Sequence, residues 1–176
     1  RPRNVVSAVV LAAGAATRFG SPKQLLLLPY VLDGLRAAPV DEVVIVSGAY
    51  PVEPAEGLDL DDVRVVNCPD WARGPGASLR CGLAALPDET THALVILADG
   101  PDLDPRAVER VLAHRDDAEI VAATYGGGVR SHPVSIARSA WGRVPDDGLR
   151  AVEPLLVRCE DLVAPGDVDL PVLEGE

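Results

Sequence analysis

Short apolar runs recur along this chain of 176 residues, separated by longer and more polar stretches. The runs occupy residues 7–11, 43–47, 63–66, 93–97 and 120–124. Each run is long enough for one buried strand, and the stretches between them are long enough for crossover helices. This spacing is typical of a mostly parallel sheet with helices on both faces. We therefore expect one α/β domain over residues 1–176.

Two of the intervening stretches carry helical signals. In residues 104–114, Asp104 can cap the N-terminus and Pro105 suits the first turn, before an apolar stripe of Ala107, Val108, Val111 and Leu112. A second helix is predicted over residues 76–86, with a stripe of Leu79, Leu83 and Leu86. Beyond residue 124 the pattern loosens into a glycine run, a short apolar segment at 134–136 and a tail rich in Pro and Asp. No repeat or linker divides the chain.

Composition and charge exclude several classes of partner. Apolar residues make up 48% of the chain, enough for a substantial core, and the formal net charge is −11. That charge opposes association with nucleic acid or acidic membranes, and no apolar run approaches the roughly 20 residues of a membrane span. A charged start before residues 5–16 imitates a secretory signal, but cleavage there would remove the first strand. We expect a soluble, cytoplasmic protein.

The cysteine pattern points to reduced thiols. Cys68, Cys81 and Cys159 are odd in number and far apart, and they include no C-x-x-C pair. The pattern argues against a disulfide framework and against a zinc site, so each cysteine is expected to be a reduced core or loop residue. The chain also contains no Met, which predicts that it is part of a longer translated product.

The segment after the first strand carries the strongest chemical signal. Residues 11–23 read Leu-Ala-Ala-Gly-Ala-Ala-Thr-Arg-Phe-Gly-Ser-Pro-Lys. Small side chains let main-chain N–H groups close on a base or phosphate, while Arg18 and Lys23 can neutralise a triphosphate. A dinucleotide fingerprint would need glycines where Ala16 and Phe19 stand, and a Walker loop would need Gly-Lys-Ser/Thr at its end. A simple tight turn would explain Gly14 but not the two cations.

Carboxylates at two distant places could hold a metal ion. Asp99 follows the apolar run at 93–97, where a charged group is costly without a partner. Oxygen ligands of this kind suit Mg²⁺, which is often shared with substrate phosphates. Two further aspartates, Asp167 and Asp169, point to the same side if the C-terminal segment is extended. Ligands of open α/β sheets lie beyond the carboxyl ends of the strands, so the loops after residues 11, 67 and 97 should converge on one crevice.

At residues 11–23 the sequence matches every fixed position of L-A-A-G-x-x-x-R-x-G-x-x-K and resembles the nucleotidyltransferases that attach a nucleoside monophosphate to molybdenum cofactor. Sugar-nucleotide and isoprenoid-precursor nucleotidyltransferases share this signature, so it indicates the reaction better than the acceptor. The resemblance extends over residues 7–171. It implies a Rossmann-type fold like that of nucleotide-diphospho-sugar transferases, and hence a single nucleotidyltransferase domain.

The resemblance also implies roles for individual residues. Arg18 and Lys23 would be catalytic, and Mg²⁺ would be held by Asp99 and by Asp169 of a terminal D-x-D-T-P-like segment in which Leu170 replaces Thr. The acceptor would face Arg130 and His132 in a stretch resembling R-G-H-P-V. The nucleotide would be bound by Leu11, Ala12, Ala13, Gly14, Gly76 and Ser78.

Some positions refine the resemblance and others depart from it. Ala13, together with the serine in the Gly-x-x-x-Ser-Leu-Arg-like segment at 74–80, is more similar to the cytidylyl branch than to the guanylyl branch, which favours CTP over GTP. The family's short glycine-bearing turn does not follow residues 25–28. Either this protein lacks that loop, or the loop's residues are missing from the sequence as given. Residues 146–150 match the family's G-D-x-G-A-R poorly, and Arg150 could hold a phosphate or cover the surface.

These observations support a hypothesis of nucleotidyl transfer from a nucleoside triphosphate to a small phosphorylated acceptor, most simply molybdopterin, with release of pyrophosphate. A phosphate nucleophile is already ionised near neutral pH, so no general base is required. Contact with a molybdoenzyme or chaperone is a further expectation. One alternative keeps the reaction and changes the acceptor to a sugar phosphate or another small phosphate ester. Another is a non-catalytic nucleotide-sensing or receiver-like module with Asp99 as phosphoacceptor.

Overall fold

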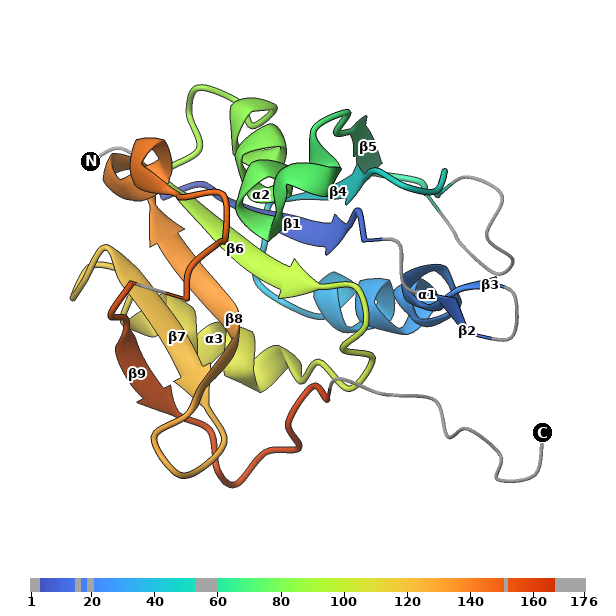
Figure 1. Ribbon diagram of the computed structural model, residues 1–176. Coiled ribbons are helices and arrows are strands. Elements are labelled where there is room, and N and C mark those ends of the chain that lie inside the picture. The colour runs from blue at the N-terminus through green and yellow to red at the C-terminus, as the bar shows by residue number, and fades with distance from the viewer. Residues whose placement is uncertain (1–3, 15–16, 19–20, 53–59, 151, 167–176) are drawn as a thin grey trace, which may run out of the picture.

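The computed structural model describes residues 4–14, 17, 18, 21–52, 60–150 and 152–166, and of residues 17, 18 and 21–25 it describes the backbone alone. A seven-stranded sheet in the order β5-β4-β1-β6-β8-β7-β9 runs through the molecule (Figure 1). A separate two-stranded sheet pairs β2 (Thr17–Arg18) with β3 (Ser21–Pro22). The expectation of a mostly parallel α/β sheet is therefore confirmed.

Four of the predicted apolar runs form the parallel half of the sheet. They are β1 (Val6–Ala12), β4 (Glu42–Ser47), β5 (Val63–Asn67) and β6 (His92–Leu97). β1 pairs in parallel with β4 on one side and with β6 on the other. Its residues from 6 to 10 are all buried, which explains why the run is continuously apolar rather than alternating.

The other half of the sheet contains one strand of opposite direction. β8 (Arg130–Ala137) runs antiparallel to both β6 and β7 (Ile120–Thr124), and β9 (Leu155–Arg158) pairs in parallel with β7. The glycine run between β7 and β8 allows the reversal, since Gly127 and Gly128 have φ values of 64° and 65°. The predicted apolar segment at 134–136 is the end of β8, whereas β9 was not predicted.

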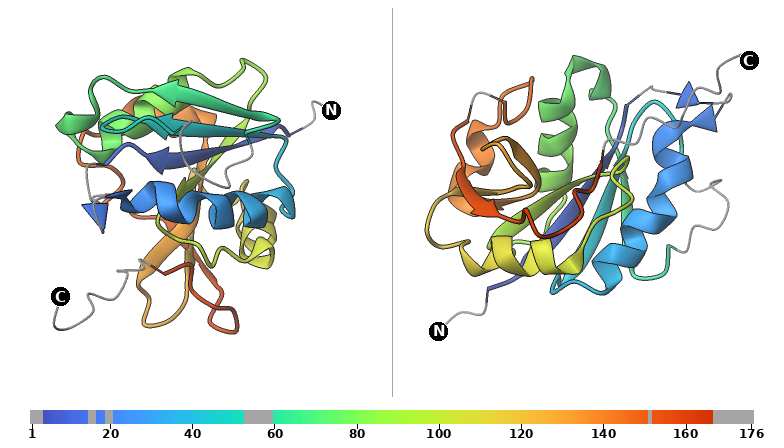
Figure 2. Two further views of the ribbon diagram at one scale, coloured as in Figure 1. Left: turned by 90° about the vertical axis from the view of Figure 1, so that its right-hand side faces the viewer. Right: turned by 90° about the horizontal axis from the view of Figure 1, so that it is seen from below.

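Helices cover both faces of the sheet, as expected (Figure 2). α2 (Pro75–Ala84) and α3 (Pro105–Ala113) confirm the two predicted helices, and Asp104 Oδ1 accepts a hydrogen bond of 2.9 Å from the Arg106 amide at the start of α3. α1 (Lys23–Arg36) was not predicted, and Pro29 lies inside it. Two short 3-10 helices complete the set, η1 (Trp71–Arg73) and η2 (Arg138–Arg143). No helix in the described ranges is long and apolar enough to cross a membrane.

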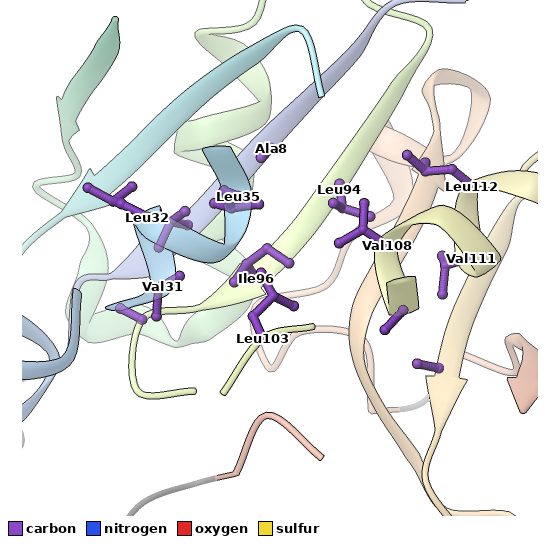
Figure 3. Packing of buried hydrophobic residues seen from close by; sticks show 14 of the residues in the cluster. Ala8, Val31, Leu32, Leu35, Leu94, Ile96, Leu103, Val108, Val111 and Leu112 are labelled. Atoms are coloured by element: carbon purple, nitrogen blue, oxygen red, sulfur yellow. The ribbon is translucent and has the colours of Figure 1, made fainter. Parts of the chain in front are cut away.

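The hydrophobic core divides into one cluster on each face of the sheet. On the first face, α1 and α3 pack against the strands through the residues shown in Figure 3, including Leu32, Leu35, Leu94, Val108 and Val111. On the second face, α2 contributes Leu79 and Leu83 to a cluster with Val9, Val44 and Ile136. Both faces of the sheet are therefore covered, and polar loops can emerge only at the ends of the strands.

The expectation that all cysteines are reduced is wrong for two of them. Cys68 and Cys81 form a disulfide across a sequence separation of 13 residues, with their Cα atoms 5.8 Å apart. Cys68 follows β5 and Cys81 lies within α2, and the chain between them turns back through η1. Spacing along the sequence does not show this fold-back. The expectation holds for Cys159, which is a buried free thiol.

A buried hydroxyl in the sheet yields a stability prediction. Ser135 is 1% exposed, and its Oγ has no hydrogen-bond partner among the described residues. In β8 it pairs with Leu94 of β6 and Val121 of β7, so its surroundings are apolar. We expect Ser135→Ala to raise the free energy of unfolding by about 1 kcal/mol, because a buried hydroxyl without a partner costs about 1–3 kcal/mol. Urea unfolding followed by circular dichroism measures this change.

Ser7→Ala is the matched control for that measurement. Ser7 is equally buried, but its Oγ lies 3.2 Å from Thr90 Oγ1 in a hydrogen bond. Removing it should lower the free energy of unfolding by about 1 kcal/mol, since Thr90 then loses its partner. A lower stability of Ser135→Ala than of the unmodified protein would contradict the prediction.

Candidate functional site

The carboxyl ends of β1, β4, β5 and β6 bring several loops to one edge of the sheet. The amide of Ala98, just after β6, donates to Leu11 O at 3.1 Å. On the other side of β1, the amide of Ala49 donates to Ala13 O at 3.1 Å, and the Cys68 amide donates to Ser47 O at 2.7 Å. The loop after β1 is thus tied directly to the turn after β6 and to the loop after β4. The predicted convergence of loops at this edge is observed.

A cavity of about 550 Å³ opens beside these loops. Its apolar wall is formed by side chains of β1, β6 and β8, namely Leu11, Val95, Leu97 and Val134. A second wall comes from the start of α2, and a third from residues 147–150. The cavity therefore lies where the parallel half of the sheet meets the antiparallel strand β8. It has room for a nucleotide-sized ligand.

The predicted nucleotide-binding residues lie in different environments. Leu11 lines the cavity, Ala12 and Ala13 are buried, and Gly14 is exposed. An added Cβ at Gly14 would meet nothing within 4 Å. Ser78 is buried in the first half of α2. Nucleotide binding by these residues stays a prediction, with Gly14 at the open end of the loop.

The two predicted catalytic cations are only partly covered by the structure. Arg18 belongs to β2, and Lys23 is the first residue of α1. The positions of their side chains lie outside the described part of the chain, and so does the whole of Asp169. The roles predicted for these three residues therefore stay predictions.

Asp99 is the described member of the predicted metal pair. It lies in the turn that follows β6, is half-buried, and is held beside Leu11 by the Ala98 amide. The turn is closed by a 3.2 Å hydrogen bond from the Gly100 amide to Leu97 O. In the described ranges no cluster of three or more His, Cys, Asp or Glu residues could hold a metal ion. A metal site here would need Asp169 or substrate oxygens in addition to Asp99.

The two predicted acceptor residues both line the cavity, from the start of β8. Arg130 Nη1 donates to Leu149 O at 2.7 Å and also to Val152 O. This guanidinium group therefore holds backbone, which the sequence did not suggest. His132 is 9% exposed and packs against Gly100, where an added Cβ would lie 2.6 Å from its Nε2 atom. Its place beside the Asp99 turn brings the predicted acceptor and metal residues together.

His132 is held in place through its backbone as well. Tyr125 Oη donates a 3.1 Å hydrogen bond to the carbonyl oxygen of His132. Burial raises the pKa of the Tyr125 phenol, so this donor stays protonated at neutral pH. The start of β8 is thus anchored by a neutral hydrogen bond.

Sequence reasoning missed the part played by residues 144–150, which we call the strap. The strap connects η2 toward β9 and runs past α2 (Figure 1). The amide of Gly76 donates to Asp146 O at 2.8 Å, and an added Cβ at Gly76 would overlap Pro145 O. Gly74, with φ of 136°, is covered in the same way by Asp146 O. These glycines allow close approach of the strap backbone, and nucleotide binding at Gly76 stays a prediction.

Two arginines fix the strap through the Asp146 carboxylate. Arg80 Nη2 donates to Asp146 Oδ1, and Arg80 Nη1 donates to Val144 O at 2.7 Å. Arg73 Nη2 lies 3.3 Å from Asp146 Oδ2. The hydrogen bond from Arg80, with the nearby charge of Arg73, lowers the pKa of Asp146. The only sequence signal for this cluster was the weak G-D-x-G-A-R match.

Comparison with known proteins agrees with this geometry. A family model described as a MobA-like NTP transferase domain matches residues 8–154. Among curated proteins, the bifunctional protein GlmU from Sorangium cellulosum is 33% identical over 157 residues, covering 79% of this chain and 33% of that protein. Across five such relatives, the match covers between 26% and 35% of the relative's length.

Two solved structures are similar to this chain over most of its length and theirs. A homologue of Mycobacterium tuberculosis Rv0371c from Mycobacterium sp. strain JC1 has a TM-score of 0.75 and 26% identity, covering 90% of this chain and 88% of that chain. Rv0371c from M. tuberculosis H37Rv in complex with manganese has a TM-score of 0.69 and 27% identity, covering 89% and 88% of the two chains.

The close contact between α2 and the strap yields a second prediction. We expect Gly76→Ala to lower the free energy of unfolding by about 1–3 kcal/mol, because the added methyl group would overlap a backbone carbonyl that cannot turn away as a flexible side chain could. The matched control is Gly142→Ala in η2, where an added Cβ meets nothing within 4 Å. That control should stay within about 0.5 kcal/mol of the unmodified protein. Equal stability of the two variants in urea would show that the strap does not pack on Gly76.

Proposed function

Because the chain belongs to the family of MobA-like NTP transferase domains, we propose that it transfers CMP from CTP to a small phosphorylated acceptor of the molybdopterin type and releases pyrophosphate. The bond from the Ala98 amide to Leu11 O is the observation that carries this proposal. It places the carboxylate-bearing turn after β6 directly beside the loop with the nucleotidyltransferase signature. A nucleotide in that loop and an ion held by Asp99 would then share one site.

In the proposed reaction an acceptor phosphate oxygen attacks the α-phosphorus of CTP in line. A new P–O bond forms as the bond to the β-phosphate oxygen breaks, and pyrophosphate leaves with that electron pair. Lys23 would hold the α-phosphate while Arg18 neutralises the departing pyrophosphate. The acceptor phosphate needs no general base because it is ionised near neutral pH. The protein's contribution is therefore positioning and neutralisation of charge.

A divalent ion fits the oxygen donors that this site offers. Asp99 is a half-buried residue in the turn that follows the cavity-lining Leu97, and carboxylate oxygen is a ligand preferred by Mg²⁺ and Mn²⁺. The manganese complex of the structural neighbour Rv0371c supports a divalent ion in this family. We propose Mg²⁺, held by Asp99 and Asp169. Such an ion would neutralise phosphate charge in the transition state.

The choice of substrates rests on residues of the signature loop, of α2 and of the cavity wall. Ala13 and Ser78 are the positions that favour CTP over GTP, as in the cytidylyl branch. His132 and Arg130 are proposed to face the acceptor from the start of β8, and Arg130 also holds the backbone of Leu149 in the wall shared with the nucleotide. The apolar wall suits a flat ring system better than a polyhydroxylated sugar. We propose no nucleic-acid or membrane partner, action in the cytoplasm, and contact with a molybdoenzyme or chaperone that takes the product.

The nucleotide and acceptor are tested together by pyrophosphate release. We expect CTP with Mg²⁺ and molybdopterin to give the fastest release among the four ribonucleoside triphosphates, and EDTA to abolish it. Mass spectrometry of the product should show a cytidylylated pterin. Release with a hexose 1-phosphate in place of molybdopterin would assign the protein to the sugar-phosphate alternative. Binding of Mg²⁺ with no consumption of any triphosphate would favour the receiver-like module.

The role of Lys23 is tested by its removal. We expect Lys23→Ala to lower kcat about a hundredfold or more, because loss of one preorganised donor to the reacting phosphate costs about 3 kcal/mol. Arg36→Ala is the matched control, since Arg36 is an exposed cation in the last turn of the same helix. That control should keep the full rate. A Lys23→Ala variant with most of its activity would contradict the proposed role.

A further inference from the structure

The strap is attached to α2 by charge and by backbone at the same point. The Asp146 carboxylate accepts from Arg80 and Arg73, while the Asp146 carbonyl oxygen accepts from the Gly76 amide at 2.8 Å. One residue therefore supplies both contacts. Arg73 ends η1 and Arg80 lies in the middle of α2. The Asp146 carboxylate therefore links η1 to α2.

The strap is also held internally and at its far end. The Gly148 amide donates to Pro145 O at 3.0 Å and closes a turn around Asp146 and Asp147. Arg130 of β8 donates to Leu149 O at 2.7 Å and to Val152 O. Between these anchors, Asp147, Gly148, Leu149 and Arg150 line the cavity. The position of that wall is thus set by Asp146 on one side and by Arg130 on the other.

The ion pairs around Asp146 are too exposed to contribute much to global stability. The side chains of Asp146, Arg80 and Arg73 are 47%, 34% and 60% exposed, and surface pairs of this kind contribute little to the free energy of unfolding. Their effect is local, because they select one position for a short segment that has no regular secondary structure. A local effect at the wall of a binding cavity changes ligand affinity rather than folding.

We propose that Asp146 is a positioning residue for nucleotide binding: it holds the strap against the start of α2, so that residues 147–150 form a preorganised wall for the nucleoside triphosphate. This inference rests on the proposed function of the cavity. Arg73 and Arg80, which pair with Asp146, would hold the strap in the same position. Without the carboxylate, the strap would have to be ordered by the ligand, and the cost of that ordering would appear in the dissociation constant.

The test compares Asp146→Asn with Asp161→Asn. Asp161 is a matched control because its carboxylate accepts two hydrogen bonds from Arg110, is 65% exposed and does not line the cavity. The first readout is hydrogen exchange at the Gly76 and Gly148 amides, which donate to the strap carbonyls. The second is the dissociation constant of CTP with Mg²⁺, measured by calorimetry. The third is the midpoint of urea unfolding.

For Asp146→Asn we expect faster exchange at both amides and an increase of about threefold to fivefold in the dissociation constant of CTP, the size expected for loss of exposed ion pairs that contribute up to about 1 kcal/mol. The unfolding midpoint should move no more than in the control, and the control should change neither exchange nor affinity. Arg80→Gln should act in the same direction. The double variant of Asp146 and Arg80 should then weaken binding by less than the product of the two single effects, because both changes break the contact between Asp146 and Arg80.

The possible failures are distinguishable. If the unmodified protein binds CTP and Asp146→Asn binds it equally well, the positioning role is overturned while the proposed function stands. Unchanged exchange at Gly76 and Gly148 would equally overturn it, since the strap would then not depend on the carboxylate. If the unmodified protein binds no nucleoside triphosphate with Mg²⁺, the proposed function fails and this inference fails with it.

Discussion

The pairing of β1 between β4 and β6 is the constraint on which the site depends. Leu11 lies opposite Val46 on one side and opposite Leu97 on the other, so all three strands end at the same level. A slip of one residue would exchange the side chains that face α1 and α3 with those that face α2, so the packing of the two core clusters determines the register. The Ala98 amide continues the pairing past the end of β6. The signature loop and the carboxylate turn meet as a direct result.

A second constraint acts on one face of the sheet, where the backbone of the strap packs on the backbone of α2. The strap approaches α2 so closely that Gly74 and Gly76 leave no room for a side chain. Such an approach joins two segments about 70 residues apart in the chain, and it is reinforced by charged side chains at its rim. The cavity thus has one wall supplied by the regular sheet and another supplied by an irregular segment. The wall formed by the sheet is held by the hydrogen bonds between its strands. The wall formed by residues 147–150 needs specific side-chain and backbone contacts to hold its position.

The predictable part of the structure is the part with strong local patterns. The five apolar runs became strands because each is long enough for one strand, although β5, at the edge of the sheet, has no buried residue. Asp104 caps α3 because capping involves only neighbours in sequence. α1 was missed although Leu28, Val31, Leu32 and Leu35 are buried at helical spacing, and Pro29 in its midst weakens the local signal. β9 was missed because four residues show too short a pattern. The disulfide was missed because it depends on the fold-back of the chain after β5.

By itself the sequence determined the class of fold, the position of the signature loop after the first strand, and the chemistry available at Arg18, Lys23 and Asp99. Those properties follow from side-chain type and local periodicity, which act over a few residues. Only the tertiary structure decided that Arg130 binds the backbone of Leu149 and that Gly76 makes room for Pro145. It also decided that Asp146 joins Arg73 and Arg80. The reason is that each of these contacts joins residues far apart in the chain, whose proximity exists only after the sheet has formed.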